Sequence, residues 1–242
     1  MARLEDLLRP GMASLKPYQS ARDEHPEGGM TFLDANENPH GTLNRYPDPR
    51  QKALRQALAE HYALDAEQIL VGNGSDEIID LLLRLFCEPG RDSALTVGPT
   101  YGMYQVAAAS HGVYCQEVPL GPHFDLQEEQ VQRILNTPRA KLLFLCSPNN
   151  PTGNIFSSYW IRYLLKEFSG IVVLDEAYAD FSRQPSWRGA TETYPRLVVM
   201  NTLSKAWGLA AARVGWAVGQ MWIIRHLQTI KPPYNVSGLN QA

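Results

Sequence analysis

Short apolar segments alternate with longer amphipathic segments along most of the chain. Each apolar segment lies next to Gly, Pro, Asn or Asp, which predicts β-strands at 69–71, 94–97, 113–118, 142–146, 171–174, 197–200 and 214–218. Between them, apolar residues recur every three or four positions, which predicts helices at 51–62, 75–86, 101–110, 126–135, 159–168 and 222–230. This alternation predicts an α/β fold, a mostly parallel sheet of about seven strands flanked by helices on both faces.

The first 45 residues lack this alternation. Pro, Gly, Asn and charged residues dominate there, and only residues 31–33 resemble a short strand. We therefore expect an N-terminal arm over residues 1–45, which lies on its own domain or on a partner subunit. Residues 46–242 are expected to form one large domain.

Polar or glycine-rich clusters follow four of the predicted strands. They are residues 72–75, 147–150, 175–176 and 201–205. Ligands of open α/β sheets bind beyond the carboxyl ends of the strands, so these clusters indicate one shared site. The turn at 150–153 either directs the Asn150 amide toward a ligand or only reverses the chain.

The cluster Gly72-Asn73-Gly74-Ser75-Asp76 joins a strand to a helix. A helix N-terminus has unpaired N–H groups and a partial positive charge, which favour a phosphate, and glycines let the backbone approach it. No Lys-Ser or Lys-Thr pair follows, so this is not a P-loop, and Glu77 occupies the third glycine position of a dinucleotide-binding motif. The alternative is a tight turn with Ser75 as the helix cap.

Four charged residues lie near strand ends, and three of them are candidates for chemistry: Asp175, Lys205 and Arg213. Asp175 ends a buried strand, where a carboxylate needs a partner, either a cation on a ligand or an arginine or helix end. Glu176 faces the other way by strand alternation, and we expect it to make a structural contact. Most lysines are solvated, but Lys205 precedes the small apolar run 206–212, and an enclosed lysine is a good nucleophile. With Arg213 nearby, two cations at one edge indicate an anion between them.

Composition narrows the class of protein. Of 242 residues, 44% are hydrophobic and 19% charged, which favours a folded core over disorder. The net charge of −3 and the lack of a basic stripe argue against a nucleic-acid binder that works by phosphate neutralisation. The most apolar segment, 78–87, contains Asp80 and Arg84, so we expect no membrane span.

Cysteine and histidine spacing argues against metal and disulfide chemistry. The three cysteines are far apart with no CxxC pair, and the N-terminus does not resemble a secretory signal, so we expect a cytoplasmic protein with reduced thiols. Neither an HExxH nor a Gly-x-Ser-x-Gly motif is present, so metalloenzyme and serine-hydrolase functions find little support.

A series of motifs spans residues 16–242. They are Lys16–Arg22, Leu33–Pro39, Arg45–Pro49, Gly72–Glu77, Ser147–Gly153, Asp175–Tyr178, Thr202–Ala206, Arg213–Gly215 and Pro232–Ser237. In this order they resemble the fold-type-I, pyridoxal-phosphate-dependent aminotransferases, and among these the histidinol-phosphate aminotransferase family. The Asn-Pro-Thr-Gly turn is weakly specific, whereas the block 202–215 is fairly specific.

The resemblance assigns roles around the ring of pyridoxal 5'-phosphate. Lys205 would bind the cofactor aldehyde and later move a proton between the substrate Cα and cofactor C4′. Asp175 would keep the pyridine nitrogen protonated, so that the ring withdraws electrons. Tyr178 and Asn150 would hydrogen-bond the ring hydroxyl, and Tyr101 would stack on the ring.

The resemblance also implies a phosphate site, a partner subunit and a substrate site. The phosphate-end residues would be Gly74, Ser75, Asp76, Ser204 and Arg213, with Thr202 as a weaker candidate. Tyr46 would reach the cofactor of the neighbouring subunit, which implies a homodimer and a draping arm. Tyr18, Asn36 and Tyr234 would lie near the substrate.

The implied reaction is amino transfer between L-histidinol phosphate and 2-oxoglutarate, giving imidazole-acetol phosphate and L-glutamate, in histidine biosynthesis. Alternatives are a related aromatic aminotransferase, a threonine-phosphate decarboxylase, or a truncated cofactor-binding remnant with little activity. Such enzymes continue into a small domain with an arginine that binds the substrate's acidic group. No arginine here matches it, so we expect residues 46–242 to be the pyridoxal-phosphate-binding large domain without the small domain.

Overall fold

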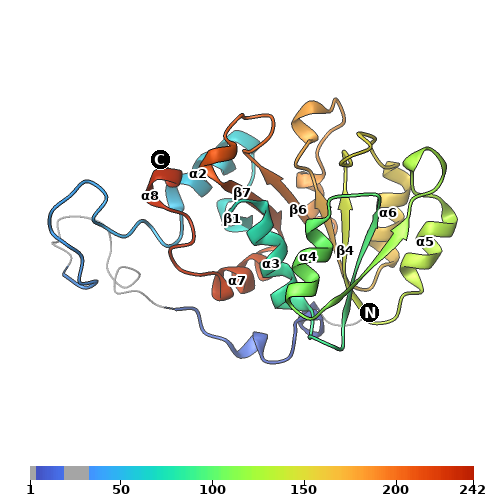
Figure 1. Ribbon diagram of the computed structural model, residues 1–242, viewed down its shortest axis with the longest axis horizontal. Coiled ribbons are helices and arrows are strands. Elements are labelled where there is room, and N and C mark those ends of the chain that lie inside the picture. Colours follow the sequence, from blue (N-terminus) through green and yellow to red (C-terminus); the bar gives the residue numbers. More distant parts are fainter. Residues whose placement is uncertain (1–3, 19–32) are drawn as a thin grey trace.

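A seven-stranded sheet forms the centre of the computed structural model, which describes residues 4–18 and 33–242 (Figure 1). Its strands are β1 Ile69–Asn73, β2 Ser93–Gly98, β3 Tyr114–Pro119, β4 Ala140–Cys146, β5 Ile171–Asp175, β6 Leu197–Thr202 and β7 Val214–Gly219. They lie in the order β1-β7-β6-β5-β4-β2-β3. Only β7 runs antiparallel to its neighbours, β1 and β6, so the predicted mostly parallel sheet is confirmed.

All six predicted helices are present, with ends within two residues of those expected. They are α2 Lys52–Tyr62, α3 Ser75–Phe86, α4 Met103–Ser110, α5 Glu128–Leu135, α6 Ser158–Glu167 and α7 Met221–Ile230. The sequence pattern did not predict the short helix α8 Gly238–Gln241. It also missed the single-turn 3-10 helices at 4–7, 12–14, 66–68, 122–124, 179–181, 187–191 and 210–212.

The helices cover both faces of the sheet, as expected for a parallel sheet whose strands are apolar on both sides. Alternate residues of β4 show this division. Leu142 and Phe144 pack in one core cluster with α3, α4 and α7. Leu143 and Leu145 pack in another with α5 and α6, and α2 covers the same face at β1 and β7.

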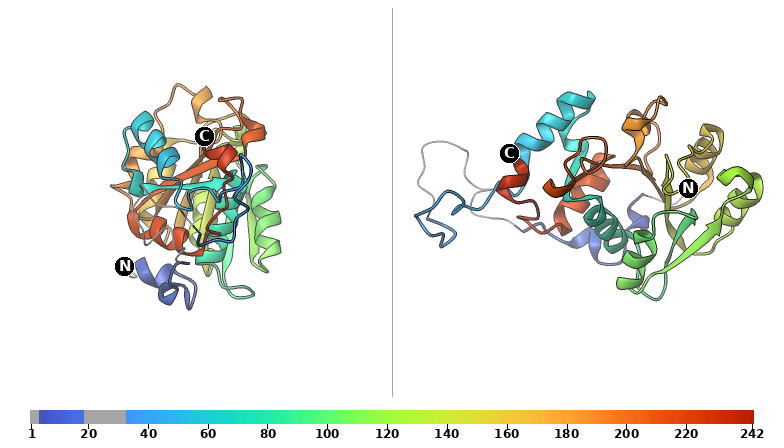
Figure 2. Two further views of the ribbon diagram at one scale, coloured as in Figure 1. Left: turned by 90° about the vertical axis from the view of Figure 1, so that its left-hand side faces the viewer. Right: turned by 45° about the horizontal axis from the view of Figure 1, so that its top comes forward.

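The N-terminal residues divide between the body of the molecule and a projecting segment. Leu7 and Leu8 are buried against the main core, and Arg9 forms an ion pair with Glu88 at 2.9 Å. Residues 33–47 extend away from the sheet (Figures 1 and 2). The expected strand at 31–33 lies outside the described residues, apart from Leu33.

Within residues 4–18 and 33–242, no helix is long and apolar enough to cross a membrane.

Close backbone contact between β7 and the turn after β1 brings the glycine-rich cluster to the sheet. Gly215 lies opposite Gly72 on one side and Thr202 on the other. A Cβ at Gly215 would overlap the backbone of Gly74 and Ser75. Only glycine therefore lets β7 pass beneath the start of α3.

We expect Gly215→Ala to lower the free energy of unfolding by about 1–3 kcal/mol, because the added methyl group has no room. Urea denaturation checks this. Gly219→Ala on the same strand is the control, since a Cβ there would meet Val198, Ile224 and the Leu197 carbonyl at ordinary distances of 3.5–3.7 Å. Equal stability losses in the two variants would contradict the steric explanation.

Candidate active site

The carboxyl ends of β4, β5 and β6 and the start of α3 surround a cleft of about 510 Å³, counted out to its open mouth. Its lining residues are Ser75, Asp76, Tyr101, Cys146, Asn150, Asp175, Ala177, Tyr178, Thr202, Ser204, Lys205 and Arg213. All except Cys146 and Ala177 are candidates from the sequence. The structure thus brings together side chains from six separate stretches of the chain.

Asp175 is the buried charge of this cleft, with only 3% of its surface exposed. Its Oδ2 accepts a hydrogen bond from the Tyr104 hydroxyl at 2.7 Å, and its Oδ1 accepts one from the Ala177 N–H at 3.0 Å. Burial raises the pKa of Asp175, and these two donors only partly offset it. No ion pair within the described residues involves Asp175, so its protein partner is a tyrosine rather than an arginine.

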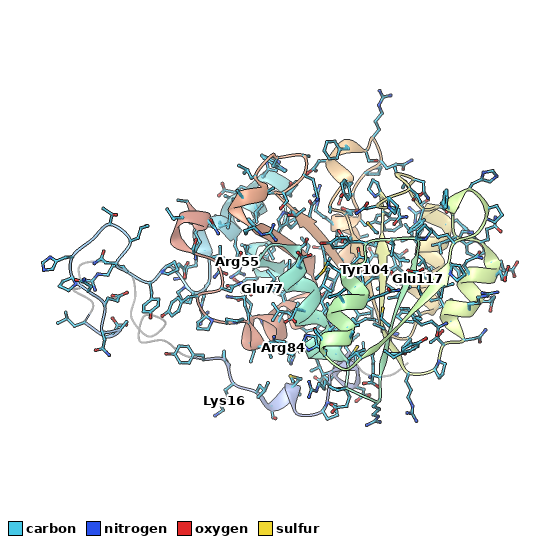
Figure 3. All side chains as sticks on the ribbon, in the orientation of Figure 1. Lys16, Arg55, Glu77, Arg84, Tyr104 and Glu117 are labelled. Carbon is cyan, nitrogen blue, oxygen red and sulfur yellow. The ribbon has the colours of Figure 1, made fainter. Side chains whose placement is uncertain are left out.

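Tyr104 is the functional residue that sequence reasoning missed. It lies on α4 (Figure 3). It is fully buried and stacks on Phe144 with 4.9 Å between ring centroids. Burial and the Asp175 carboxylate raise its pKa well above the ordinary value, so the hydroxyl remains a donor. A buried tyrosine hydroxyl normally has a polar partner, which is the signal that could have identified it.

The turn before α3 differs from the predicted serine cap. The residue before the helix is Gly74, with a φ of 82°, and no side chain caps it. The prediction that Ser75 caps the helix is wrong, because Ser75 is already its first residue. Instead, the Glu77 carboxylate reaches back and accepts the Asn73 N–H at 2.5 Å.

Arg213 adds a positive charge to this turn. A Cβ at Gly74 would overlap its guanidinium, so the arginine lies directly against the glycine. Nη2 is 3.7 Å from Asp76 Oδ2. The guanidinium and the start of α3 together favour an anion, since both present positive charge to the same space.

Lys205 lies in the loop after β6, where its Nζ is 5.6 Å from the centroid of the Tyr178 ring. The prediction that the run 206–212 encloses it is wrong. Lys205 and residues 206–211 are exposed, because the chain turns outward before β7. The base of the loop is fixed by Thr202, whose hydroxyl donates to the Val214 carbonyl at 3.1 Å and accepts the Ser204 N–H at 3.1 Å.

Burial raises the pKa of two further residues that line the cleft. The Tyr101 hydroxyl donates to Asp76 at 3.0 Å, and burial together with Asp76 raises the pKa of Tyr101 to about 12. Burial, with a contribution from Asp175, raises the pKa of the Cys146 thiol to about 12. This thiol is therefore no nucleophile near neutral pH, since the thiolate is the reactive form.

In two of the motifs, one of two neighbouring residues makes structural contacts and the other lines the cleft. Asn149 is buried, and its amide donates to the Pro99 carbonyl at 2.9 Å, whereas Asn150 lines the cleft. Glu176 accepts the Trp187 N–H at 2.8 Å and contacts the Ser186 hydroxyl. The structural contact expected for Glu176 is therefore confirmed.

The remaining sequence candidates do not reach this cleft within one chain. Asn36, Tyr46 and Tyr234 line a separate pocket, where the two tyrosines stack with 4.5 Å between centroids. Tyr18 lines another groove beside Pro233. Among the described residues, no group of three or more His, Cys, Asp or Glu side chains could hold a metal ion.

Comparisons with known proteins agree on one family. A family model described as aminotransferase class I and II matches residues 10–242. A histidinol-phosphate aminotransferase of Parabacteroides distasonis is 50% identical over 242 residues, which is 100% of this chain and 70% of that protein.

Solved structures share the fold. The histidinol-phosphate aminotransferase of Sinorhizobium meliloti, in complex with pyridoxal-5'-phosphate, aligns with a TM-score of 0.75 and 24% identity. The alignment covers 82% of this chain and 55% of that one. The L-threonine-O-3-phosphate decarboxylase of Porphyromonas gingivalis aligns with a TM-score of 0.70 and 23% identity, covering 82% and 61%. The chain spans less than two thirds of these solved chains.

We expect Tyr104→Phe to destabilise the protein by roughly 2 kcal/mol at about pH 7, because a carboxylate loses its strongest donor. Since native Asp175 keeps its proton to a higher pH than the unfolded chain, stability is lost as pH rises through the native pKa. The variant raises that pKa further, so its deficit should shrink toward pH ~4.

Urea denaturation across this pH range measures the effect, with Tyr159→Phe, at an exposed position of α6, as the control. A Tyr104→Phe deficit that is the same at both pH values would contradict the charge-dependent hydrogen bond.

Proposed function

We propose a function from the premise that this chain belongs to the class I and II aminotransferase family. It is a pyridoxal-phosphate-dependent aminotransferase of histidine biosynthesis. It transfers an amino group between L-histidinol phosphate and 2-oxoglutarate, giving imidazole-acetol phosphate and L-glutamate. The names of its relatives support the reaction class and pathway.

One observation carries the proposal: the cleft holds a buried carboxylate without an ion-pair partner among the described residues, together with an anion-favouring turn. Pyridoxal phosphate has a protonated ring nitrogen, an aldehyde and a phosphate. Asp175 complements the ring nitrogen, Lys205 the aldehyde, and the Gly74–Ser75 turn with Arg213 the phosphate. The residues present therefore fit this cofactor.

When bound, the cofactor supplies an electron sink for the bonds at the substrate Cα. Asp175 would hold the proton on the ring nitrogen, and Tyr104 keeps the carboxylate in place. Lys205 Nζ would hold the cofactor at its aldehyde carbon, and as a free amine it would move the proton at the substrate Cα.

The other lining residues orient the ring and the phosphate. Tyr178 and Asn150 would hydrogen-bond the ring hydroxyl, and Tyr101 would cover the ring and exclude water. At the phosphate end, the cleft is completed by Ser75, Asp76, Thr202 and Ser204. The Thr202 hydroxyl forms a hydrogen bond with the Ser204 hydroxyl.

We also propose a homodimer in the cytoplasm with shared sites. Tyr46 and Tyr234 form a stacked pair beside Asn36, away from the cleft of their own chain. This position suits residues that serve the cleft of a partner subunit, as does the exposed Tyr18. Tyr46 would then contact the partner's phosphate end, and Tyr18, Asn36 and Tyr234 its substrate.

We expect L-histidinol phosphate to change the visible spectrum of the protein loaded with pyridoxal phosphate, and 2-oxoglutarate to reverse the change. Lys205→Ala should abolish the change, because no amine then moves the proton at the substrate Cα. Lys166→Ala, on α6 outside the cleft, is the matched control and should respond normally.

Carbon dioxide release from O-phospho-L-threonine, with no response to L-histidinol phosphate, would replace the proposal with a decarboxylase. A loaded protein that responds to neither compound would contradict both.

A further inference from the structure

A chain of hydrogen bonds connects the end of α7 to the turn before α3. It starts at Lys231, which is 6% exposed. Its Nζ donates to the Pro49 carbonyl at 3.1 Å, the Pro232 carbonyl at 3.2 Å and Asn235 Oδ1 at 2.8 Å. An ammonium group has three donors, so these contacts satisfy it fully.

The chain continues through Asn235 to Glu77. Asn235 Nδ2 donates to Glu77 Oε2 at 2.6 Å and to the Val71 carbonyl at 3.3 Å. The same Glu77 oxygen accepts the Asn73 N–H at 2.5 Å. Glu77 lies in the first turn of α3, beside the sheet (Figure 3). The hydrogen bonds thus run from Lys231 to the residue that precedes Gly74.

We propose that Glu77, Asn235 and Lys231 are positioning residues that hold the Gly74–Ser75 turn in its anion-binding shape. The inference rests on the proposed function in one respect: the natural anion is the phosphate of the cofactor. None of the three residues lines the cleft. They act through the backbone of the turn.

The direction of each hydrogen bond explains why these residue types are needed. The Asn73 N–H and the Asn235 amide both donate to the same Glu77 oxygen, Oε2, so position 77 must place an acceptor oxygen there, as a carboxylate does. Gly74 then takes a φ of 82°, which leaves the start of α3 uncapped by any side chain. Without Glu77, the Asn73 N–H loses its hydrogen-bond acceptor, and the Gly74–Ser75 turn can adopt another conformation.

Charge explains the buried lysine. Glu77 places a negative charge two residues beyond Ser75, which by itself would repel an anion. Lys231 offsets this charge through Asn235. Burial lowers the pKa of Lys231 to about 8, against opposing contributions from Glu77 and Asp48, while Arg55 lowers it further. The lysine is therefore mostly charged at neutral pH.

The test uses Glu77→Leu in the full chain. Leucine has a similar size but offers no acceptor to the two donors that face Oε2. We expect affinity for inorganic phosphate, followed by the amide NMR shifts of Gly74 and Ser75, to fall about tenfold. Affinity for pyridoxal phosphate should fall similarly, and affinity for pyridoxal, which lacks the phosphate, should not change.

Two further variants keep the proposal falsifiable if Glu77→Leu folds poorly. Asn235→Ala retains the Glu77–Asn73 contact and should weaken phosphate binding by about threefold. Glu77→Gln is the conservative variant: its amide oxygen can accept both hydrogen bonds at the position of Oε2, so it should retain most of the phosphate affinity. Glu67→Gln, an exposed partner of Arg55, is the control.

Unchanged phosphate affinity in Glu77→Leu would overturn the proposal. So would an equal loss of affinity for pyridoxal and pyridoxal phosphate, which would show a general structural role. If phosphate binds at Gly74 and Ser75 and depends on Glu77, but no amino transfer occurs, the positioning role stands and the proposed function fails.

Discussion

Burying the carboxylate of Asp175 at the end of β5 costs several kcal/mol of free energy unless a partner offsets it. Tyr104 and the Ala177 N–H are uncharged donors, and they recover only part of that cost. The raised pKa of Asp175 expresses the remainder. A cationic ring nitrogen would supply the missing charge, so ligand binding and the ionisation of this residue are linked.

The sheet order determines how far the phosphate end lies from this carboxylate. β6 and β7 separate β5 from β1, and β7 runs antiparallel between β6 and β1. Gly215 lets β7 pass close beneath the turn after β1, and Arg213 immediately before β7 brings a cation onto Gly74. The two ends of the cleft are thus set by backbone packing rather than by mobile side chains.

Much of this arrangement could be predicted from sequence, because buried parallel strands are apolar runs and their ends carry polar clusters. The order of the strands and the antiparallel β7 do not follow from periodicity, which carries no information on pairing. Tyr104 was missed because an aromatic residue on a helix resembles core packing until its hydroxyl partner is known. The predicted enclosure of Lys205 was wrong, since small apolar residues also occur in exposed loops. Tyr46 and Tyr234 could be selected as candidates, but their pairing depends on contacts between distant segments.

The central claim is that Lys205 is the amine that meets the cofactor in this cleft. Borohydride reduction of the protein with pyridoxal phosphate, followed by mass spectrometry of its peptides, tests it directly. The account predicts that the cofactor is fixed to Lys205 and that prior addition of excess inorganic phosphate reduces the labelling. Labelling spread over surface lysines, or concentrated on Lys141 or Lys231 with Lys205 unmodified, would contradict it.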